Sequence, residues 1–199
     1  MQQEIEAKFL NQNHDEIRAK LKVLGAVMEQ PTKLVRRTTF DFPDRRLLAK
    51  RAWVRLREEL NGTVELMLKQ VVDDTLGQTF EQPITVNSYE AAKQFVLALG
   101  LEVKSEQESK RELWRLGGAE IMLDEWPWVK PYIEIEAPTE DLVKNLANKL
   151  NLNWVDAKFG GVTPVYVAQY DISAEQFEAI DVPMKFDLPI PEYLIKRLN

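Results

Sequence analysis

Five short segments of the sequence alternate strictly between apolar residues and residues that are mostly charged. The clearest is EIEAKF at residues 4–9, and the pattern recurs in WVRLRE, VELMLKQ, EIMLDE and YIEIEA. Successive side chains of an extended chain point to opposite faces of a sheet, whereas the side chains of a helix return to the same face about every 3.6 residues. Each segment is therefore predicted to be a β-strand with one face for an apolar core and one face that carries charge.

Eight strands are predicted in all, and turn residues separate several of them. The pairs NG at residues 61–62 and GG at residues 117–118 indicate two hairpins, and WPW at residues 126–128 indicates a further turn. Adjacent hairpins favour a largely antiparallel sheet, and eight strands are enough to close such a sheet into a barrel. The strands are expected at residues 3–9, 34–42, 52–59, 63–70, 78–86, 107–116, 119–125 and 131–137.

Three amphipathic helices are predicted to flank this barrel, and each directly follows an Asn, Ser or Thr. The helices are expected at residues 14–25, 89–100 and 140–151, with shorter ones near residues 163–169 and 173–180. The predicted fold class is therefore α+β, a closed eight-stranded antiparallel β-barrel with flanking helices. No linker is visible, so we expect a single domain over residues 1–199, with residues 172–199 or so as a C-terminal wrapping extension.

The overall composition excludes several classes of site. The 32 acids outnumber the 26 bases, and a net charge of −6 argues against a general nucleic-acid binder. There is no cysteine for a thiolate or zinc site, and a single histidine excludes a multi-histidine metal site. No apolar run approaches the roughly 20 residues of a membrane helix, and no secretory signal is visible, so we expect a cytoplasmic protein without a membrane partner.

The charged strand faces allow two arrangements. They can form the solvent side of a sheet, with ion pairs between neighbouring strands. Alternatively, the helices cover the outside of a barrel and the charged faces line its interior, where unpaired charges are costly to bury. A wet tunnel that holds a polyanion and a divalent metal removes that cost. Arg and Lys then contact phosphate oxygens, and paired Glu carboxylates coordinate a hard cation.

The order of these charged motifs resembles the CYTH family, the triphosphate tunnel metalloenzymes. The opening Glu-x-Glu-x-Lys strand of that family resembles EIEAK, and its Arg-x-Arg strand resembles RLR within WVRLR. The latter segment also looks like the thiamine triphosphatase strand that carries a tryptophan two residues before the first arginine. The match runs from residue 4 to about residue 170. The positions that carry the resemblance are Glu4, Glu6, Lys8, Trp53, Arg55, Arg57, Lys69, Arg111, Asp124, Glu134, Glu136 and Lys158.

Two positions depart from the family pattern. The middle strand often carries Glu-x-Glu, but here Glu81 stands alone, with Thr79 at the earlier position. The Lys-x-Arg pair of a later basic strand appears as adjacent Lys110 and Arg111, so Lys110 is expected to point outward.

The resemblance implies a tunnel that binds a small triphosphate compound with Mg²⁺ or Mn²⁺. It implies a metal-dependent triphosphatase that hydrolyses inorganic triphosphate, thiamine triphosphate or a nucleoside triphosphate. The implied catalytic residues are Glu4, Glu6, Lys8 and Lys69. The implied substrate-binding residues are Trp53, Arg55, Arg57, Arg111 and Lys158. The implied metal ligands are Glu4, Glu6, Asp124, Glu134 and Glu136.

Two alternative functions stay open at this point. A class IV adenylyl cyclase uses the same tunnel to make cyclic AMP and pyrophosphate from ATP, but nothing in the sequence specifies an adenine pocket. A non-catalytic module that binds polyphosphate or an organic triphosphate is supported only by the acid missing near Glu81. The sequence does not specify the oligomeric state.

Overall fold

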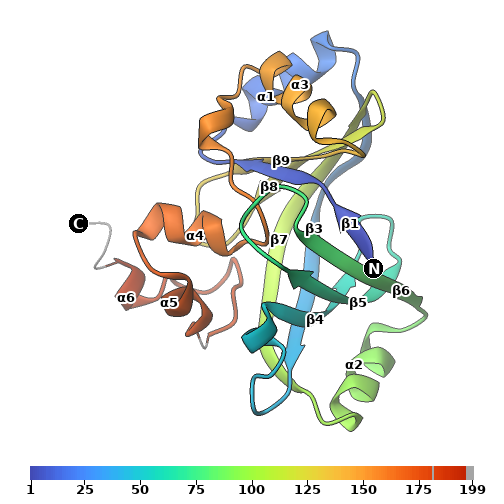
Figure 1. Ribbon diagram of the computed structural model, residues 1–199, viewed down its shortest axis with the longest axis vertical. Coiled ribbons are helices and arrows are strands. Elements are labelled where there is room, and N and C mark those ends of the chain that lie inside the picture. Colours follow the sequence, from blue (N-terminus) through green and yellow to red (C-terminus); the bar gives the residue numbers. More distant parts are fainter. Residues whose placement is uncertain (181, 196–199) are drawn as a thin grey trace.

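The strands form one antiparallel sheet that curls into a nearly closed barrel in the computed structural model, which describes residues 1–180 and 182–195 (Figure 1). The strands are β1 (Gln2–Glu4), β2 (Glu6–Phe9), β3 (Val27–Asp41), β4 (Ala52–Glu58), β5 (Val64–Val71), β6 (Thr79–Val86), β7 (Glu102–Leu116), β8 (Ala119–Glu125) and β9 (Tyr132–Glu136). Their order in the sheet is β1-β6-β5-β4-β3-β7-β8-β9-β2. Both predicted hairpins, β4–β5 and β7–β8, are confirmed.

The opening strand corrects the predicted count and closure, because residues 3–9 belong to two strands rather than one. β1 pairs with β6 and β2 pairs with β9, so these two short strands occupy the two ends of the sheet order. The break falls at Ile5, whose carbonyl accepts a hydrogen bond of 3.1 Å from the Ala137 amide. The chain itself thus joins the two sheet edges, and the described residues form nine strands in a nearly closed barrel rather than eight in a closed one.

β3 and β7 are longer than predicted, because they begin at Val27 and Glu102 rather than at residues 34 and 107. The two strands pair with each other from Val27 opposite Arg115 to Asp41 opposite Glu102, with register shifts on the way. The added residues are largely polar and do not alternate regularly. Their extended conformation is therefore set by pairing with the neighbouring strand and not by their own sequence pattern.

The long helices cover the outside of the barrel and bury the apolar strand faces there. α1 (His14–Val23) and α3 (Glu140–Lys149) pack on the outer face of β2, β8 and β9, and Figure 1 shows them together at the top. α2 (Tyr89–Ala98) packs on the outer face of β3 and β4, at the lower end. The side chains of Asn13, Ser88 and Thr139 cap these helices, so the predicted positions are confirmed.

The C-terminal part forms short elements beside the barrel, at the left of Figure 1. They are α4 (Thr163–Tyr170), α5 (Ala174–Glu178) and α6 (Glu192–Ile195), while η2 (Trp154–Asp156) packs with α3 and η1 (Leu48–Lys50) precedes β4. Tyr166 and Phe177 pack against Trp126 and Tyr132 of the barrel. Met184 exchanges two backbone hydrogen bonds of 2.9 Å with β7, so this segment continues the sheet where β8 has ended.

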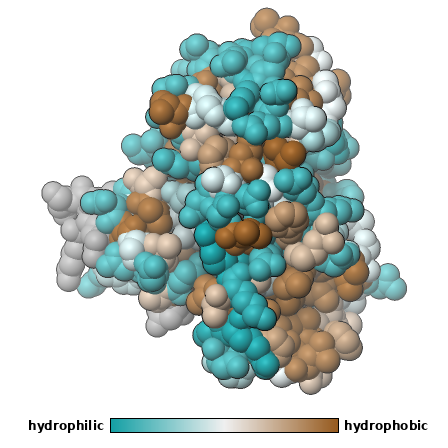
Figure 2. All heavy atoms as spheres, in the orientation of Figure 1, coloured by the Kyte–Doolittle hydropathy of each residue, from teal (hydrophilic) through white to brown (hydrophobic). Residues whose placement is uncertain are grey.

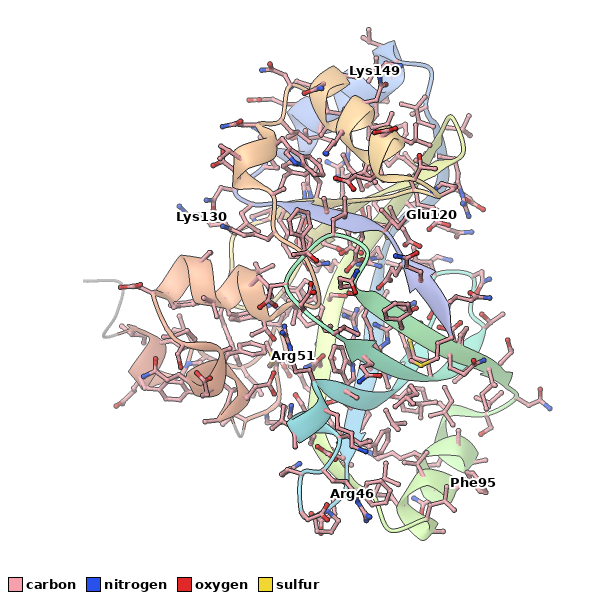
Figure 3. All side chains as sticks on the ribbon, in the orientation of Figure 1. Arg46, Arg51, Phe95, Glu120, Lys130 and Lys149 are labelled. Atoms are coloured by element: carbon pink, nitrogen blue, oxygen red, sulfur yellow. The ribbon has the colours of Figure 1, made fainter. Side chains whose placement is uncertain are left out.

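The outer surface carries apolar side chains around α2, as the lower right of Figure 2 shows. Phe95, which projects from α2 in Figure 3, and Leu99 are each 60% exposed. Within the described residues, every helix is too short or too polar to cross a lipid bilayer.

Candidate functional site: a charged barrel interior

The charged faces of the strands point inward and line one cavity of about 1580 Å³. All the strands described above contribute to its wall, while their apolar faces pack beneath the helices. The alternative of a solvent-facing charged sheet is therefore wrong. Every predicted site residue except Asp124 lies on the cavity wall: Glu4, Glu6, Lys8, Trp53, Arg55, Arg57, Lys69, Arg111, Glu134, Glu136 and Lys158.

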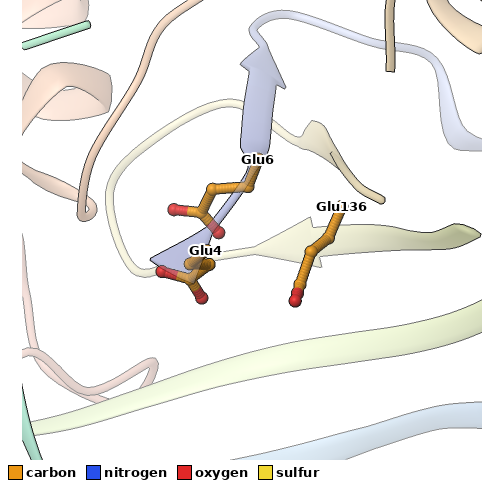
Figure 4. A group of neighbouring side chains, drawn as sticks. All are labelled: Glu4, Glu6 and Glu136. Carbon is orange, nitrogen blue, oxygen red and sulfur yellow. The ribbon is translucent and has the colours of Figure 1, made fainter. Parts of the chain in front are cut away.

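Three carboxylates converge on one side of the cavity. Glu4 ends β1, Glu6 begins β2, and Glu136 of β9 lies opposite Glu6 in the register. One carboxylate oxygen of each lies within 4.8 Å of those of the other two, and Figure 4 shows the three side chains gathered around one space. Carboxylate oxygens are the ligands that hard divalent cations prefer, so this three-carboxylate group fits Mg²⁺ or Mn²⁺.

Burial and mutual repulsion make this group hard to ionise in full. Burial, together with the neighbouring Glu134 and Glu4, raises the pKa of Glu6 well above its ordinary value. Burial and the charges of Glu4 and Glu134 likewise raise the pKa of Glu136 to about 7. A bound divalent cation would compensate the negative charge, so the arrangement favours a metal ion over three separate anions.

The two predicted catalytic lysines lie among these acids. Lys8 Nζ donates to Glu6 Oε1 at 2.6 Å and to the Gly160 carbonyl at 2.6 Å. Lys69 Nζ lies 2.6 Å from Glu4 Oε2 and 2.9 Å from Glu81 Oε1. Burial would lower the pKa of both lysines, but the surrounding carboxylates outweigh burial and raise it. Both lysines therefore remain cations beside the three-carboxylate group.

The other two predicted metal ligands, Asp124 and Glu134, form ion pairs with Arg111 and Lys8. Asp124 is fully buried, and its two oxygens accept hydrogen bonds from Arg111 Nε at 2.7 Å and Arg111 Nη2 at 2.5 Å. Glu134 Oε2 lies 3.4 Å from Lys8 Nζ and 3.4 Å from Arg111 Nη2. Burial would raise the pKa of Glu134, but these two cations hold it well below its usual range. The geometry thus gives Asp124 a place behind Arg111 and outside the three-carboxylate group.

Arginines concentrate on the part of the barrel built by β3, β4 and β7. Arg55 Nη2 lies 3.4 Å from Glu81 Oε1, and Arg57 forms ion pairs with Glu59 and Glu65. Glu81, the single acid of its strand pattern, also lines the cavity. Burial alone would raise its pKa, but the charges of Lys69 and Arg55 outweigh burial and lower the pKa to about 2. We call Arg37, Arg55, Arg57 and Arg111 the arginine wall.

Arg37 of β3 is a cavity residue that the sequence reasoning missed. It lies opposite Arg57 in the register and is only 6% exposed. Its face of the strand also carries Val35 and Thr39, so no row of charges marks it in the sequence. Burial and the charges of Arg57, Arg111 and Arg55 lower the pKa of Arg37 to about 9.

The remaining predicted residues lie where the C-terminal part meets the barrel. The backbone of Lys158 exchanges hydrogen bonds of 2.8 and 2.9 Å with that of Lys8. The Trp53 ring lies against Gly161, where an added Cβ would stand 3.6 Å from Trp53 Cη2. Phe177 and Met184 line the same cavity, so the C-terminal part contributes to its wall.

The part of the chain that forms the barrel matches one known protein family. The family model for the CYTH domain matches residues 2–154, which is most of the chain. The chain belongs to the CYTH family. The resemblance inferred from the order of the charged motifs is thereby confirmed, and CYTH members are metal-dependent enzymes that act on small triphosphates.

Solved structures share the CYTH fold at low sequence identity. The PH1012 protein of Pyrococcus horikoshii is 22% identical with a TM-score of 0.66, over 77% of this chain and 93% of its own. A putative adenylate cyclase of Vibrio parahaemolyticus is 19% identical with a TM-score of 0.73, over 82% and 97%. A putative adenylyl cyclase of Hippeastrum, described as having a dominant triphosphatase activity, is 16% identical with a TM-score of 0.58, over 79% and 91%. A search among curated proteins finds no significant match.

The CYTH barrel of this chain places opposite charges across one cavity. β3 and β4 lie in the middle of the sheet order, and β1 and β2 lie at its two ends, which the chain joins. Arg37 of β3 therefore lies on the side of the barrel away from the three-carboxylate group, whereas Arg55 and Arg111 approach that group through Glu81 and Glu134. Such a pair of walls can bind an anion on one side and a cation on the other, so a metal-bound polyanion satisfies both.

Proposed function

We propose that the protein is a metal-dependent triphosphatase that hydrolyses inorganic triphosphate, thiamine triphosphate or a nucleoside triphosphate inside the barrel. The observation that carries the proposal is the convergence of Glu4, Glu6 and Glu136 in the same cavity as the arginine wall. Triphosphate carries about four negative charges near neutral pH, so its hydrolysis depends mainly on positioning and charge neutralisation. The cavity supplies both from fixed side chains.

In this proposal the three-carboxylate group holds Mg²⁺ or Mn²⁺. When bound, that ion polarises phosphoryl oxygens and neutralises charge that develops in the transition state. Arg55 and Arg57 bind phosphoryl oxygens from the facing wall, where a guanidinium can donate two hydrogen bonds at once. Lys8 and Lys69 adjoin both the carboxylates and the cavity, so they are placed to contact phosphoryl oxygens next to the ion.

The carboxylates that the sequence suggested as further metal ligands have a different role in this proposal. Asp124 and Glu134 hold Arg111 through the contacts described above, and thereby fix the direction of its remaining donors. A buried carboxylate that holds a guanidinium in one orientation keeps it from forming ion pairs with the three-carboxylate group. Asp124 is therefore proposed as a positioning residue.

The organic part of a substrate would lie near Trp53 and Lys158. Trp53 offers a partly exposed aromatic ring on the cavity wall, and such a ring can stack on a thiazolium or a nucleobase. This position supports thiamine triphosphate or a nucleoside triphosphate as well as inorganic triphosphate. The triphosphate chain itself makes the contacts common to all three.

An adenylyl cyclase is the second candidate, because two of the similar structures are named as putative cyclases. Cyclisation requires the ribose 3′-hydroxyl of ATP to attack the α-phosphorus, and hence a defined seat for ribose and base. A binding module without turnover is the third candidate. The three-carboxylate group, which can hold a metal ion, favours hydrolysis over binding alone.

One experiment separates these candidates. Purified protein is incubated with Mg²⁺ or Mn²⁺ and with inorganic triphosphate, thiamine triphosphate or ATP, and the products are identified. Release of orthophosphate supports the triphosphatase. Cyclic AMP with pyrophosphate would identify a cyclase instead, and binding without products would identify a module.

A further inference from the structure

Arg37 is a buried cation that has no carboxylate within ion-pair distance in the described residues, and Asp124 acts on it only from farther away. Among residues 1–180 and 182–195, no carboxylate oxygen forms an ion pair with it. The other arginines of the arginine wall each have such a partner: Arg55 with Glu81, Arg57 with Glu59, and Arg111 with Asp124. An unpaired buried charge is costly, so it calls for a partner that the chain does not supply.

The surroundings of Arg37 hold its guanidinium in place without neutralising it. Arg37 Nη2 donates to Ser109 Oγ at 2.5 Å, and Arg37 Cζ lies 4.3 Å from the centroid of the Trp126 ring. Arg37 Nε is buried and has no hydrogen-bond partner in the described structure. Ser109 is fully buried as well, so the guanidinium is fixed by packing on one side and by a hydroxyl on the other.

The position of Arg37 points to the kind of partner. Arg57 is its register neighbour on β4, and Arg37 lines the same cavity as Arg55 and Arg111. Three further cations around one unpaired guanidinium create a positive potential that a compact oxyanion would neutralise. β3 lies across the barrel from the three-carboxylate group, so this oxyanion is a different phosphoryl group from one that the metal ion contacts.

We propose that Arg37 and its neighbours on the arginine wall form a metal-independent phosphate subsite. This inference rests on the proposed function, and it adds the place where the chain of phosphoryl groups is anchored away from the metal ion. The ligand is a tetrahedral phosphate oxyanion, which is either a phosphoryl group of the triphosphate or orthophosphate left after hydrolysis. Arg37 contributes charge and a planar fork of donors to it.

The test measures binding without metal. Triphosphate, and separately orthophosphate, are titrated by calorimetry into the whole protein in EDTA, using wild type, R37M and R36M. Arg36 is the matched control because it is the neighbouring arginine of β3 but is exposed. R37M is expected to weaken triphosphate binding roughly 10- to 100-fold, as for loss of a charge-assisted hydrogen bond, while R36M changes it less than about twofold.

The two ligands distinguish the two sources of the phosphate. If R37M weakens only triphosphate, the subsite takes a phosphoryl group of the substrate. If R37M also abolishes orthophosphate binding, the subsite retains the product. Unchanged affinity of R37M for both anions, in a preparation whose wild type is an active triphosphatase, overturns this inference alone. A wild type that neither binds nor cleaves triphosphate with Mg²⁺ or Mn²⁺ overturns the proposed function and this inference together.

A structural role for Arg37 predicts a different pattern. If Arg37 served only to pack on Trp126, R37M would lower the melting temperature without ligand and leave the affinity of the folded fraction unchanged. We expect the ligand-free melting temperature to stay the same or rise, since Met fills the space without an unpaired charge. Should R37M not fold, R37K keeps a charge but lacks the fork, and it is expected to bind triphosphate at least about threefold more weakly. Equal affinity of R37K and wild type would then overturn the inference.

Discussion

Replacing Glu136 by Gln should stabilise the metal-free protein at high pH and remove its response to metal. The pKa of Glu136 is about 7 against an ordinary value of 4.5, because burial and neighbouring carboxylates disfavour its charge. At about 1.4 kcal/mol per pH unit, the difference corresponds to roughly 3 kcal/mol of unfolding free energy. A neutral glutamine at this position carries no such cost, and about 2–4 °C per kcal/mol for a chain of this size gives roughly 6–12 °C.

The sign of the pH dependence follows from the raised pKa. Below about pH 4.5 Glu136 is protonated in both the folded and the unfolded protein, so it has no effect on stability. Between about pH 4.5 and pH 7 the unfolded chain loses its proton first, and the folded protein becomes progressively less stable. The advantage of E136Q should therefore be absent near pH 4.5, grow as pH rises, and level off above about pH 7.

The assay is thermal unfolding followed by circular dichroism, in EDTA at several pH values between about 4.5 and 8. Glu58 is an exposed carboxylate of β4, so E58Q is the matched control and should follow wild type throughout. Addition of Mn²⁺ at pH 8 should reverse the order, since ion at about 1,000 times its Kd adds roughly 4.1 kcal/mol to wild type but little to E136Q. Parallel melting curves of wild type and E136Q across this pH range, or equal stabilisation of both by Mn²⁺, would refute the reasoning.

Three further predictions concern the same cavity. The double variant E4Q/E6Q should remain folded by circular dichroism but lose metal-dependent phosphate release by about 10²-fold or more, and near-normal turnover would show that these acids do not serve the reaction. R55A and R57A should each reduce the rise in melting temperature that triphosphate causes, yet change the ligand-free melting temperature little, because burial and mutual repulsion already disfavour the charge of Arg55; shifts equal to that of wild type would count against the arginine wall as the phosphate site. W53A should raise the KM for thiamine triphosphate or ATP severalfold while leaving inorganic triphosphate nearly unchanged, and an equal effect on all three would assign Trp53 to packing.

The periodicity of the sequence predicted which faces of the strands are charged and where the helices begin. Ile5, Ala7 and Phe9 alternate with Glu4, Glu6 and Lys8. In the structure the apolar side chains pack between the barrel and its covering helices, and the charged side chains line the cavity. This worked because the covering helices are amphipathic and the alternation has a period of about two, so each residue has only one possible face.

The details of pairing were not predictable from the same pattern. The break at Ile5 depends on the chain reaching both β6 and β9, which is a property of the nearly closed barrel and not of residues 3–9. Asp124 stays a predicted metal ligand, but nothing in the sequence indicated that its cross-strand partner is Arg111. Arg37 was missed for the converse reason, since its strand carries no neighbouring charges on that face.

Crystals grown with Mn²⁺ and a non-hydrolysable triphosphate would test most directly whether the cavity binds a metal-bound polyanion between opposite walls. We expect an anomalous difference peak in direct contact with carboxylate oxygens of Glu4, Glu6 and Glu136, with the phosphoryl chain running from that peak toward Arg55 and Arg37. An anomalous peak outside the three-carboxylate group, or a triphosphate bound away from the arginine wall, would contradict this arrangement.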